Sequence, residues 1–352
     1  MSVVQGKNKI MVLLLICLFT AILCQLMGMT AVMAVMFMLI QTLDDESDLS
    51  QSRMIFVAAA MICAWFGRFP IGMGAALPLT TNAYYEGLVE GNSEYLIGMF
   101  DFLKVGFFPS ICLTVYTIAA WKLIPKQEVN ASAVSSVGVG GQRNAAPSIS
   151  SFQEKVIFLV FLGVMLAFFF SGSLGSLIYI IPAAGVLVLI YTKSLSVDEV
   201  LRTLSGDMIW MVAGVLVISS ALSSSGAGEF VGNLVLRLLG DNPSGLLVTT
   251  VFCVFTTIMT NFLSNNACIA IMTPIAASTA LAGGMNPKAV VLIVFCSACL
   301  AIAFPTGCAA ATMAFSIGNH NPMKTLKFCI PYLIIGMAST IASAMFFYPV
   351  YG

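Results

Sequence analysis

The stretch TTIMTNFLSNNACIAIMTPIA, residues Thr256–Ala276, lies inside a long apolar region, yet its centre carries a turn of three polar residues, Ser264, Asn265 and Asn266. Apolar arms flank this turn on both sides. Polar side chains at membrane depth are unfavourable unless they line a cavity or meet partners. The sequence therefore predicts a helical hairpin whose polar tip serves a function.

The composition is that of a membrane protein. Of the 352 residues, 59% are hydrophobic and 9% are charged, whereas soluble domains carry roughly 25% charged residues. We therefore expect an all-α polytopic protein embedded in the lipid bilayer of the cytoplasmic membrane. The 15 basic and 15 acidic residues balance, so no nucleic-acid partner is expected.

The titratable residues exclude most catalytic and metal-binding functions. The ten cysteines lie mostly in apolar segments, and His320 is the only histidine. Cysteines in such segments are typical of close helix packing. The apolar segments contain no pairing of Ser with Lys, of His with Glu or of two Asp that would suggest a membrane-embedded enzyme. We therefore expect a protein that is not an enzyme.

Residues 1–126 form the first predicted repeat, which is shortened at its N-terminus. Its apolar hairpin, residues 10–42, is interrupted by Gln25, Gly28 and Thr30. The next segment, residues 54–79, contains AWFGRFPIGMGAALP, and glycine and proline at this density break a helix. We expect two half-helices around an unwound centre near residues 69–74, a recurring arrangement in transporters. A polar loop at 82–104 and a span at 105–123 follow.

Residues 127–153, rich in Ser, Gly, Ala and Val, predict a flexible cytoplasmic linker. The second predicted repeat, residues 154–352, begins with spans and an amphipathic interfacial helix and then repeats the earlier order of elements. Its predicted elements are spans at 156–170, 174–191 and 208–222, the interfacial helix at 228–240, a hairpin at 244–282, a broken helix at 288–318 and a closing span at 328–348.

Two sequence features occur twice at nearly the same spacing. The first turn reads GMTAVMAVM (28–36) and the second SNNACIAIM (264–272), an offset of 264 − 28 = 236. The broken helices read FPIGMGAA (69–76) and FPTGCAAA (304–311), an offset of 304 − 69 = 235. Paired, Gly/Pro-interrupted segments in corresponding positions are the best sequence indication of a transporter binding site.

The charges predict an orientation. If both hairpins are re-entrant and enter from opposite sides, 11 basic residues fall on one face and 3 on the other, with Arg68 inside the membrane. The positive-inside rule makes the rich face cytoplasmic. Hairpins that cross fully would give the same count, so charge does not settle re-entrance. The polar tip favours it, because Ser-Asn-Asn between apolar arms suits a cavity better than an external loop.

These motifs resemble a known family. The SNNA turn, the FP-x-G broken helix and FDFLKVGFFPSICLTVYTIAAWKLIP (100–125) are similar to the divalent anion/sodium symporter family (sodium:sulfate/dicarboxylate symporter type). That family belongs to the wider ion-transporter superfamily of citrate, dicarboxylate, sulfate and arsenite carriers. The resemblance implies inverted repeats, a re-entrant hairpin in each, Na⁺ coupling and elevator-like motion against a dimeric scaffold.

The chain departs from the family pattern at three places. The first tip keeps only Thr30 of the Ser-Asn-Thr that the family carries at each hairpin tip. The broken helices end in Ala75-Ala76 and Ala310-Ala311 where the family has hydroxyl and amide residues. The family's opening scaffold helices have no counterpart, so we expect a truncated chain, a different start or a complementing partner.

The resemblance and the broken helices together predict the site residues. Half-helix N-termini and amide or hydroxyl groups would bind an anion, and carbonyl oxygens would hold Na⁺. The alternatives are packing roles: interhelical hydrogen bonds for the polar tip and Thr30, backbone repair for Thr306, and snorkelling for Arg68. The predicted substrate-binding residues are Ser264, Asn265, Asn266, Thr30, Thr306 and Arg68, and the predicted Na⁺ ligands are Ser264, Asn266 and Thr30.

The leading hypothesis is a secondary active transporter of elevator type, acting as a homodimer. It would move a small anion of the di-/tricarboxylate or sulfate class, driven by Na⁺ or H⁺. Two alternatives stay open: an arsenite or other organic-anion carrier of the same superfamily, and a non-transporting remnant or one half of a split carrier.

Overall fold

The computed structural model describes residues 9–43, 49–89, 92–130, 150–169, 177–205, 224–240 and 243–350, with a few positions between 210 and 221. Within these ranges every regular element is a helix. Three of the described helices are long and apolar enough to cross a membrane: Asp101–Leu123, Asn265–Ala282 and Pro322–Phe347. Several shorter apolar helices accompany them. The expected all-α, polytopic membrane fold is confirmed.

The first half contains two helix pairs and a closing helix. The predicted hairpin becomes α1 and α2, and the predicted broken helix becomes α3 and α4 with residues 66–72 unwound between them. The elements are α1 (Lys9–Leu26), α2 (Met29–Ile40), α3 (Gln51–Trp65), α4 (Met73–Ala83) and α5 (Asp101–Ala120).

The last part of the chain has the same order of elements. A hairpin is followed by a broken helix, whose residues 299–308 are unwound, and by a long closing helix. The elements are α13 (Gly245–Thr260), α14 (Asn265–Ala282), α15 (Pro287–Ala298), α16 (Ala309–Ile317) and α17 (Pro322–Phe347).

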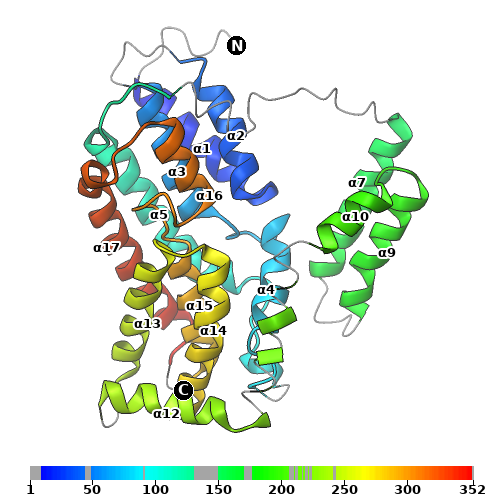
Figure 1. Cartoon of the computed structure of the whole chain (residues 1–352), viewed down its shortest axis with the longest axis vertical. Coiled ribbons are helices and arrows are strands. Elements are labelled where there is room, and N and C mark those ends of the chain that lie inside the picture. The colour runs from blue at the N-terminus through cyan, green and yellow to red at the C-terminus, as the bar shows by residue number, and fades with distance from the viewer. Residues whose placement is uncertain are drawn as a thin grey trace.

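Between these two groups in the sequence, the described residues include four further helices. They are α7 (Ser151–Phe169), α9 (Leu177–Tyr191), α10 (Val197–Leu204) and α12 (Ala227–Leu239). In Figure 1, α7, α9 and α10 stand beside the main body, and α7 contacts it through α4. Most of the predicted linker, residues 131–149, and most of the predicted span 208–222 lie outside the described residues, and α7 begins inside the predicted linker.

The two hairpins lie at opposite ends of the main body (Figure 1). Matching side chains also occupy matching places. Ser50 caps α3 and Asn286 caps α15. Arg53 lies over the ring of Trp121 at the end of α5, and Lys288 lies over the ring of Tyr348 at the end of α17. These correspondences support the inverted repeat, which stays a prediction.

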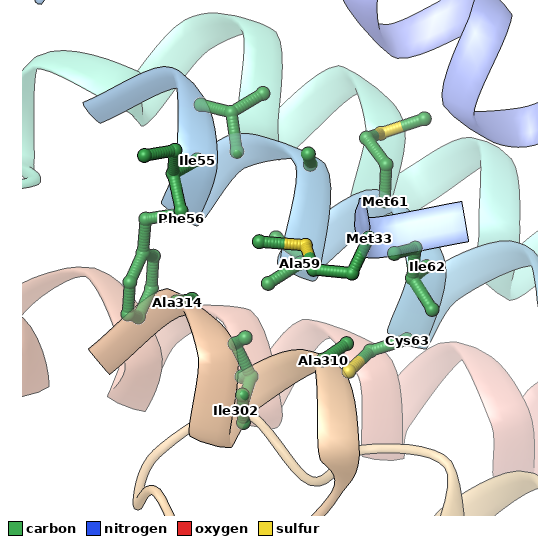
Figure 2. Close-up of a cluster of buried hydrophobic side chains, with 14 of the residues drawn as sticks. Met33, Ile55, Phe56, Ala59, Met61, Ile62, Cys63, Ile302, Ala310 and Ala314 are labelled. Atoms are coloured by element: carbon green, nitrogen blue, oxygen red, sulfur yellow. The ribbon is translucent and has the colours of Figure 1, made fainter. Parts of the chain in front are cut away.

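The hydrophobic core surrounds α3, which is buried on nearly all sides because small residues such as Ala58, Ala59 and Ala60 let other helices approach closely. Helices α1, α2, α5 and α16 all contact it. Figure 2 shows side chains of α3 packed against Ala310 and Ala314 of α16. One core therefore joins both halves of the chain.

The closing helix α5 begins at Asp101, four residues before the predicted start of the span at Val105. The polar loop predicted for residues 82–104 therefore ends earlier. The reason is that the Asp101 carboxylate accepts the backbone N–H of Gly98 at 2.7 Å and pairs with Lys288 at 2.7 Å. A carboxylate in the first turn also stabilises a helix through its dipole.

Two thiols from distant parts of the chain lie close together in this core. The Sγ atoms of Cys63 on α3 and Cys308 in the second break are 3.8 Å apart. A disulfide needs about 2.05 Å, so a small shift brings them into bonding range. We predict that mild copper-catalysed oxidation links the two residues, detected by mass spectrometry of non-reduced peptides. Cys63→Ala is the control; a linked Cys308 peptide in that variant, or none in the wild type, contradicts the packing of α3 against α16.

His320, between α16 and α17, has an environment that makes stability depend on pH. Its ring packs edge-on against Phe56, and Nε2 lies 2.9 Å from the carbonyl oxygen of Ser52. Nδ1 has no hydrogen-bond partner among the described residues. Burial and the neighbouring Arg53 charge lower the pKa of His320 from its ordinary value of 6.5. The unfolded chain therefore takes up the proton first, so stability is present above pH 6.5 and is lost as the pH falls below it.

We accordingly expect a lower melting temperature at pH 5 than at pH 7.5 for the purified protein. In His320→Asn, which lacks the titrating ring, the difference between the two pH values should shrink. An equal difference in both proteins assigns the pH dependence to other groups.

Candidate functional site

The first break, residues 66–72, forms because the chain there cannot continue a helix. Pro70 lacks a backbone N–H and disfavours a helical conformation at Phe69. Gly67 and Gly72 have φ values of +67° and +58°, which L side chains rarely adopt. The chain then restarts as α4 at Met73, so the N-terminus of α4 lies at the break.

The second break, residues 299–308, contains Pro305 and ends at Cys308. Cys308 is the N-cap of α16, and its Sγ accepts the backbone N–H of Ala311 at 3.4 Å. The polar tip of the second hairpin also acts as a cap, since Ser264 Oγ accepts the backbone N–H of Ala267 at 3.3 Å. The sequence thus starts one helix at each tip and one at each break.

A cavity of about 330 Å³ lies where the tips and breaks meet. Both hairpin tips contribute, together with both breaks and parts of α4, α14, α15 and α16. The lining residues are Gly28, Met29, Thr30, Phe66, Met73, Leu77, Ser264, Asn265, Asn266, Ile269, Phe295, Cys299, Gly307, Cys308 and Ala309. The structure thus brings together four of the six predicted substrate residues: Thr30, Ser264, Asn265 and Asn266.

Four helix N-termini converge on this cavity. Helices α2, α4, α14 and α16 begin at Met29, Met73, Asn265 and Ala309, and each of these first residues lines it. A helix N-terminus carries unsatisfied N–H groups and about half a positive charge. Four of them sum to about two elementary charges. The cavity therefore favours an anion although none of the described lining residues has a charged side chain.

The amide of Asn265 sits among oxygen atoms behind the second tip. With its nitrogen facing them, it lies 3.1 Å from the carbonyl oxygens of Ala298 and Gly307 and 3.0 Å from Thr260 Oγ1. With its oxygen facing them, four oxygens converge, and Thr260 Oγ1 donates to Asn265 Oδ1 at 3.0 Å. In the first orientation the amide itself satisfies these oxygens by donating to them. In the second, the converging oxygens are the type of ligand that hard cations prefer, so the donor set fits Na⁺ in that orientation.

The first tip has no such group of oxygens. The positions that correspond to Thr260, Ser264 and Asn265 at the offset of 236 are occupied by Cys24, Gly28 and Met29. Thr30 is exposed and lines the cavity beside Gly28 and Met29, whose side chains offer no oxygen. Of the predicted Na⁺ ligands, Ser264 has its hydroxyl engaged in capping, and the oxygen atoms gather at Asn265, which was predicted for substrate. The roles of Ser264, Asn266 and Thr30 in ion binding stay predictions.

The other two predicted substrate residues do not line the cavity. Thr306 Oγ1 donates to the carbonyl oxygen of Asn261 at 2.8 Å, which ties the second break to α13. Arg68 is 2% exposed, and its guanidinium donates to the carbonyl oxygen of Ala64 at 3.1 Å and to Cys296 Sγ at 3.1 Å. It therefore neither faces the cavity nor snorkels to an interface.

Arg68 remains a fixed positive charge near the site. Gly106 on α5 makes room for it, because a Cβ there would lie 2.5 Å from Arg68 Cδ. Among the described residues, no carboxylate lies within ion-pair distance of it. Its field therefore adds to that of the helix N-termini without direct contact with a bound anion.

Two buried amides that were not among the predicted site residues connect hairpins to breaks. They are Gln25 at the end of α1 and Asn261 at the end of α13. A signal for them exists in the sequence, because both stand three residues before the tip and are separated by 236 positions.

Comparison with known proteins identifies the family of the chain. The family model of the citrate transporters (CitMHS) matches residues 1–295 and 179–350. The chain belongs to this citrate transporter family. Its relatives are transporters and not enzymes, as expected, and the chain is a multi-pass membrane protein.

Several curated proteins are similar to parts of this family member. An uncharacterized transporter of Synechocystis, sll0640, is 28% identical over 167 residues, 47% of this chain and 27% of that protein. Human solute carrier family 13 member 4 is 28% identical over 136 residues, 39% of this chain and 21% of that protein. The uncharacterized transporter MJ0672 of Methanocaldococcus jannaschii is 26% identical over 263 residues, 72% of this chain and 55% of that protein. The matched regions thus span about a fifth to just over half of these relatives.

Proposed function

We propose that this chain binds and carries a small anion of the di-/tricarboxylate or sulfate class as a secondary active transporter. The convergence of four helix N-termini on one cavity carries the proposal. Such N-termini bind carboxylate, sulfate and phosphate groups through free N–H groups. Their combined charge of about two elementary units matches a divalent anion.

The volume and lining of the cavity agree with a small substrate. Its 330 Å³ lies at the lower end of the range for small-molecule sites. Phe66, Leu77 and Phe295 form apolar walls, whereas Ser264 and Asn266 offer polar groups on one side. An anion with a short carbon skeleton would place one charged group toward α14 and α16 and its apolar part against these walls.

We further propose that transport is coupled to one Na⁺. The support is the group of oxygens around Asn265, contributed by Thr260, Ala298 and Gly307. The corresponding first-half positions offer no such set. A cation in the second half would also lie beside the bound anion and stabilise it, which is the physical basis of obligatory coupling.

An elevator motion within a homodimer in the cytoplasmic membrane completes the proposal. Hairpin α1–α2 shares a core with α3 and α16, and hairpin α13–α14 shares a core with α15. Because α15 and α16 are the two parts of one broken helix, this packing favours movement of both hairpins together. Helix α7 contacts that body through α4, and α9 packs on α7. Both helices have apolar exposed faces, as scaffold helices would.

The test is uptake of labelled citrate, succinate or sulfate into proteoliposomes that contain the purified chain. We expect uptake driven by an inward Na⁺ gradient and little uptake when choline replaces Na⁺. Equal uptake with Na⁺ and with choline would reject the Na⁺ coupling but not the transport of the anion. Failure of every anion to enter or to exchange rejects transport by this chain.

A further inference from the structure

The amide of Asn261 connects the second hairpin to the second broken helix. Its Nδ2 donates to the carbonyl oxygen of Leu300 at 3.1 Å and to that of Thr257, one turn earlier, at 2.7 Å. Its Oδ1 accepts the backbone N–H of Ala303 at 2.8 Å. The side chain is 3% exposed, so these bonds satisfy backbone groups that the break leaves without helical partners.

The amide of Gln25 makes the same set of bonds in the first half. Its Nε2 donates to the carbonyl oxygen of Trp65 at 2.8 Å and to that of Ala21, one turn earlier, at 2.9 Å. Its Oε1 accepts the backbone N–H of Phe69 at 3.2 Å. This side chain is 7% exposed.

The two amides are equivalent in sequence and in bonding. Gln25 and Asn261 are separated by 236 positions, and the carbonyl acceptors at Trp65 and Leu300 by 235. In each half one carboxamide binds a carbonyl at the start of the break, Trp65 just before the first break and Leu300 just inside the second, and an N–H further along the break. It also stays bonded to its own helix. A residue that only filled space would not need this reciprocal pattern.

We propose that Gln25 and Asn261 are a matched pair of positioning residues that fix each broken helix against the tip of its hairpin. This inference rests on the proposed function, because what they position is the anion and cation site. Gln25 keeps the starts of α2 and α4 aimed at the cavity, and Asn261 does the same for α14 and α16.

The two residues act on different parts of the site. The backbone carbonyl oxygen of Asn261 also accepts a hydrogen bond from Thr306 Oγ1 at 2.8 Å. Its neighbour Thr260 donates to the carbonyl oxygen of Ala298 at 2.6 Å, within the oxygen group around Asn265. Asn261 therefore positions oxygens that suit a cation, whereas Gln25 positions helix N-termini that face only the anion.

The experiment compares Asn261→Leu with Gln25→Leu, each of which removes the amide and keeps comparable volume. Asn261→Leu is expected to raise the half-saturating Na⁺ concentration about tenfold, the effect of one or two lost hydrogen bonds. Gln25→Leu should raise the KM for the anion by a similar factor and leave the half-saturating Na⁺ concentration within about twofold of wild type. If both variants changed the half-saturating Na⁺ concentration and the KM for the anion equally, the two residues would have only a general packing role.

Hydrogen exchange separates failure of this inference from failure of the proposed function, because it needs no transport. In detergent-solubilised full-length protein, Asn261→Leu should speed amide exchange in residues 299–308 and leave 66–72 unchanged, and Gln25→Leu should do the reverse. No local change in either variant overturns the positioning role even if the wild type transports. The expected local changes in a chain that transports no anion uphold the positioning role and reject only the transport function.

Discussion

Asn265→Ala is expected to abolish most Na⁺-stimulated uptake while the chain stays folded. The Asn265 side chain is 9% exposed and lies about 3 Å from Ala298 O, Gly307 O and Thr260 Oγ1. Alanine leaves these oxygens without the amide and removes one ligand of the proposed cation. A polar contact to a charged group contributes about 1.5–3 kcal/mol, which corresponds to a roughly 10- to 160-fold weaker affinity for Na⁺.

The measurement is the Na⁺ concentration at half-maximal uptake in proteoliposomes. Met29→Ala is the matched control, because Met29 holds the corresponding place at the first tip and offers no oxygen. We expect its half-saturating Na⁺ concentration to stay within about twofold of wild type. If Met29→Ala weakened Na⁺ binding as much as Asn265→Ala, the proposed asymmetry between the two halves would be wrong.

Much of the architecture could be predicted from the sequence because membrane helices and their interruptions leave strong local signals. Gly and Pro at 67–72 and at 305–307 indicate the two breaks, and the polar tip at 264–266 indicates the start of α14. The start of α5 was placed too late, because only the folded chain brings Lys288 to Asp101. Contacts between residues far apart in the sequence have no local signal.

The site was predicted less completely, for the same physical reason. The tips were expected to meet, and Thr30, Ser264, Asn265 and Asn266 do line one cavity. Arg68 was a candidate because of its charge, but the place of its guanidinium depends on the space left by Gly106 in another helix. The bonds of Gln25 and Asn261 depend on backbone groups that become free only when a helix unwinds, which the identity of a side chain does not show.

Gly72→Ala is the second change with a large expected effect, and it acts on stability. Gly72 has a φ of +58°, and a Cβ there would lie 2.5 Å from the carbonyl oxygen of Gln25 and 3.1 Å from that of Leu26. A side chain in this backbone region costs about 1–3 kcal/mol, and the approach to rigid backbone adds to that cost. We expect a clearly lower melting temperature of the detergent-solubilised protein, together with loss of anion uptake as the first tip is displaced.

Gly28→Ala provides the control for Gly72→Ala because it adds the same methyl group to the hairpin tip that lies next to Gly72 in the first break. Gly28 has a φ of −68°, and nothing lies within 4 Å of a Cβ built on it, so its melting temperature should match that of the wild type. A comparable loss of stability in both variants would contradict the close packing of the first break against the hairpin. The same packing recurs at Gly307, where a Cβ would lie 3.0 Å from the carbonyl oxygen of Thr260. The φ of Gly307 is not in the left-handed region, so Gly307→Ala should cost less stability than Gly72→Ala. It should act mainly by moving the carbonyl oxygen of residue 307, which belongs to the proposed cation site.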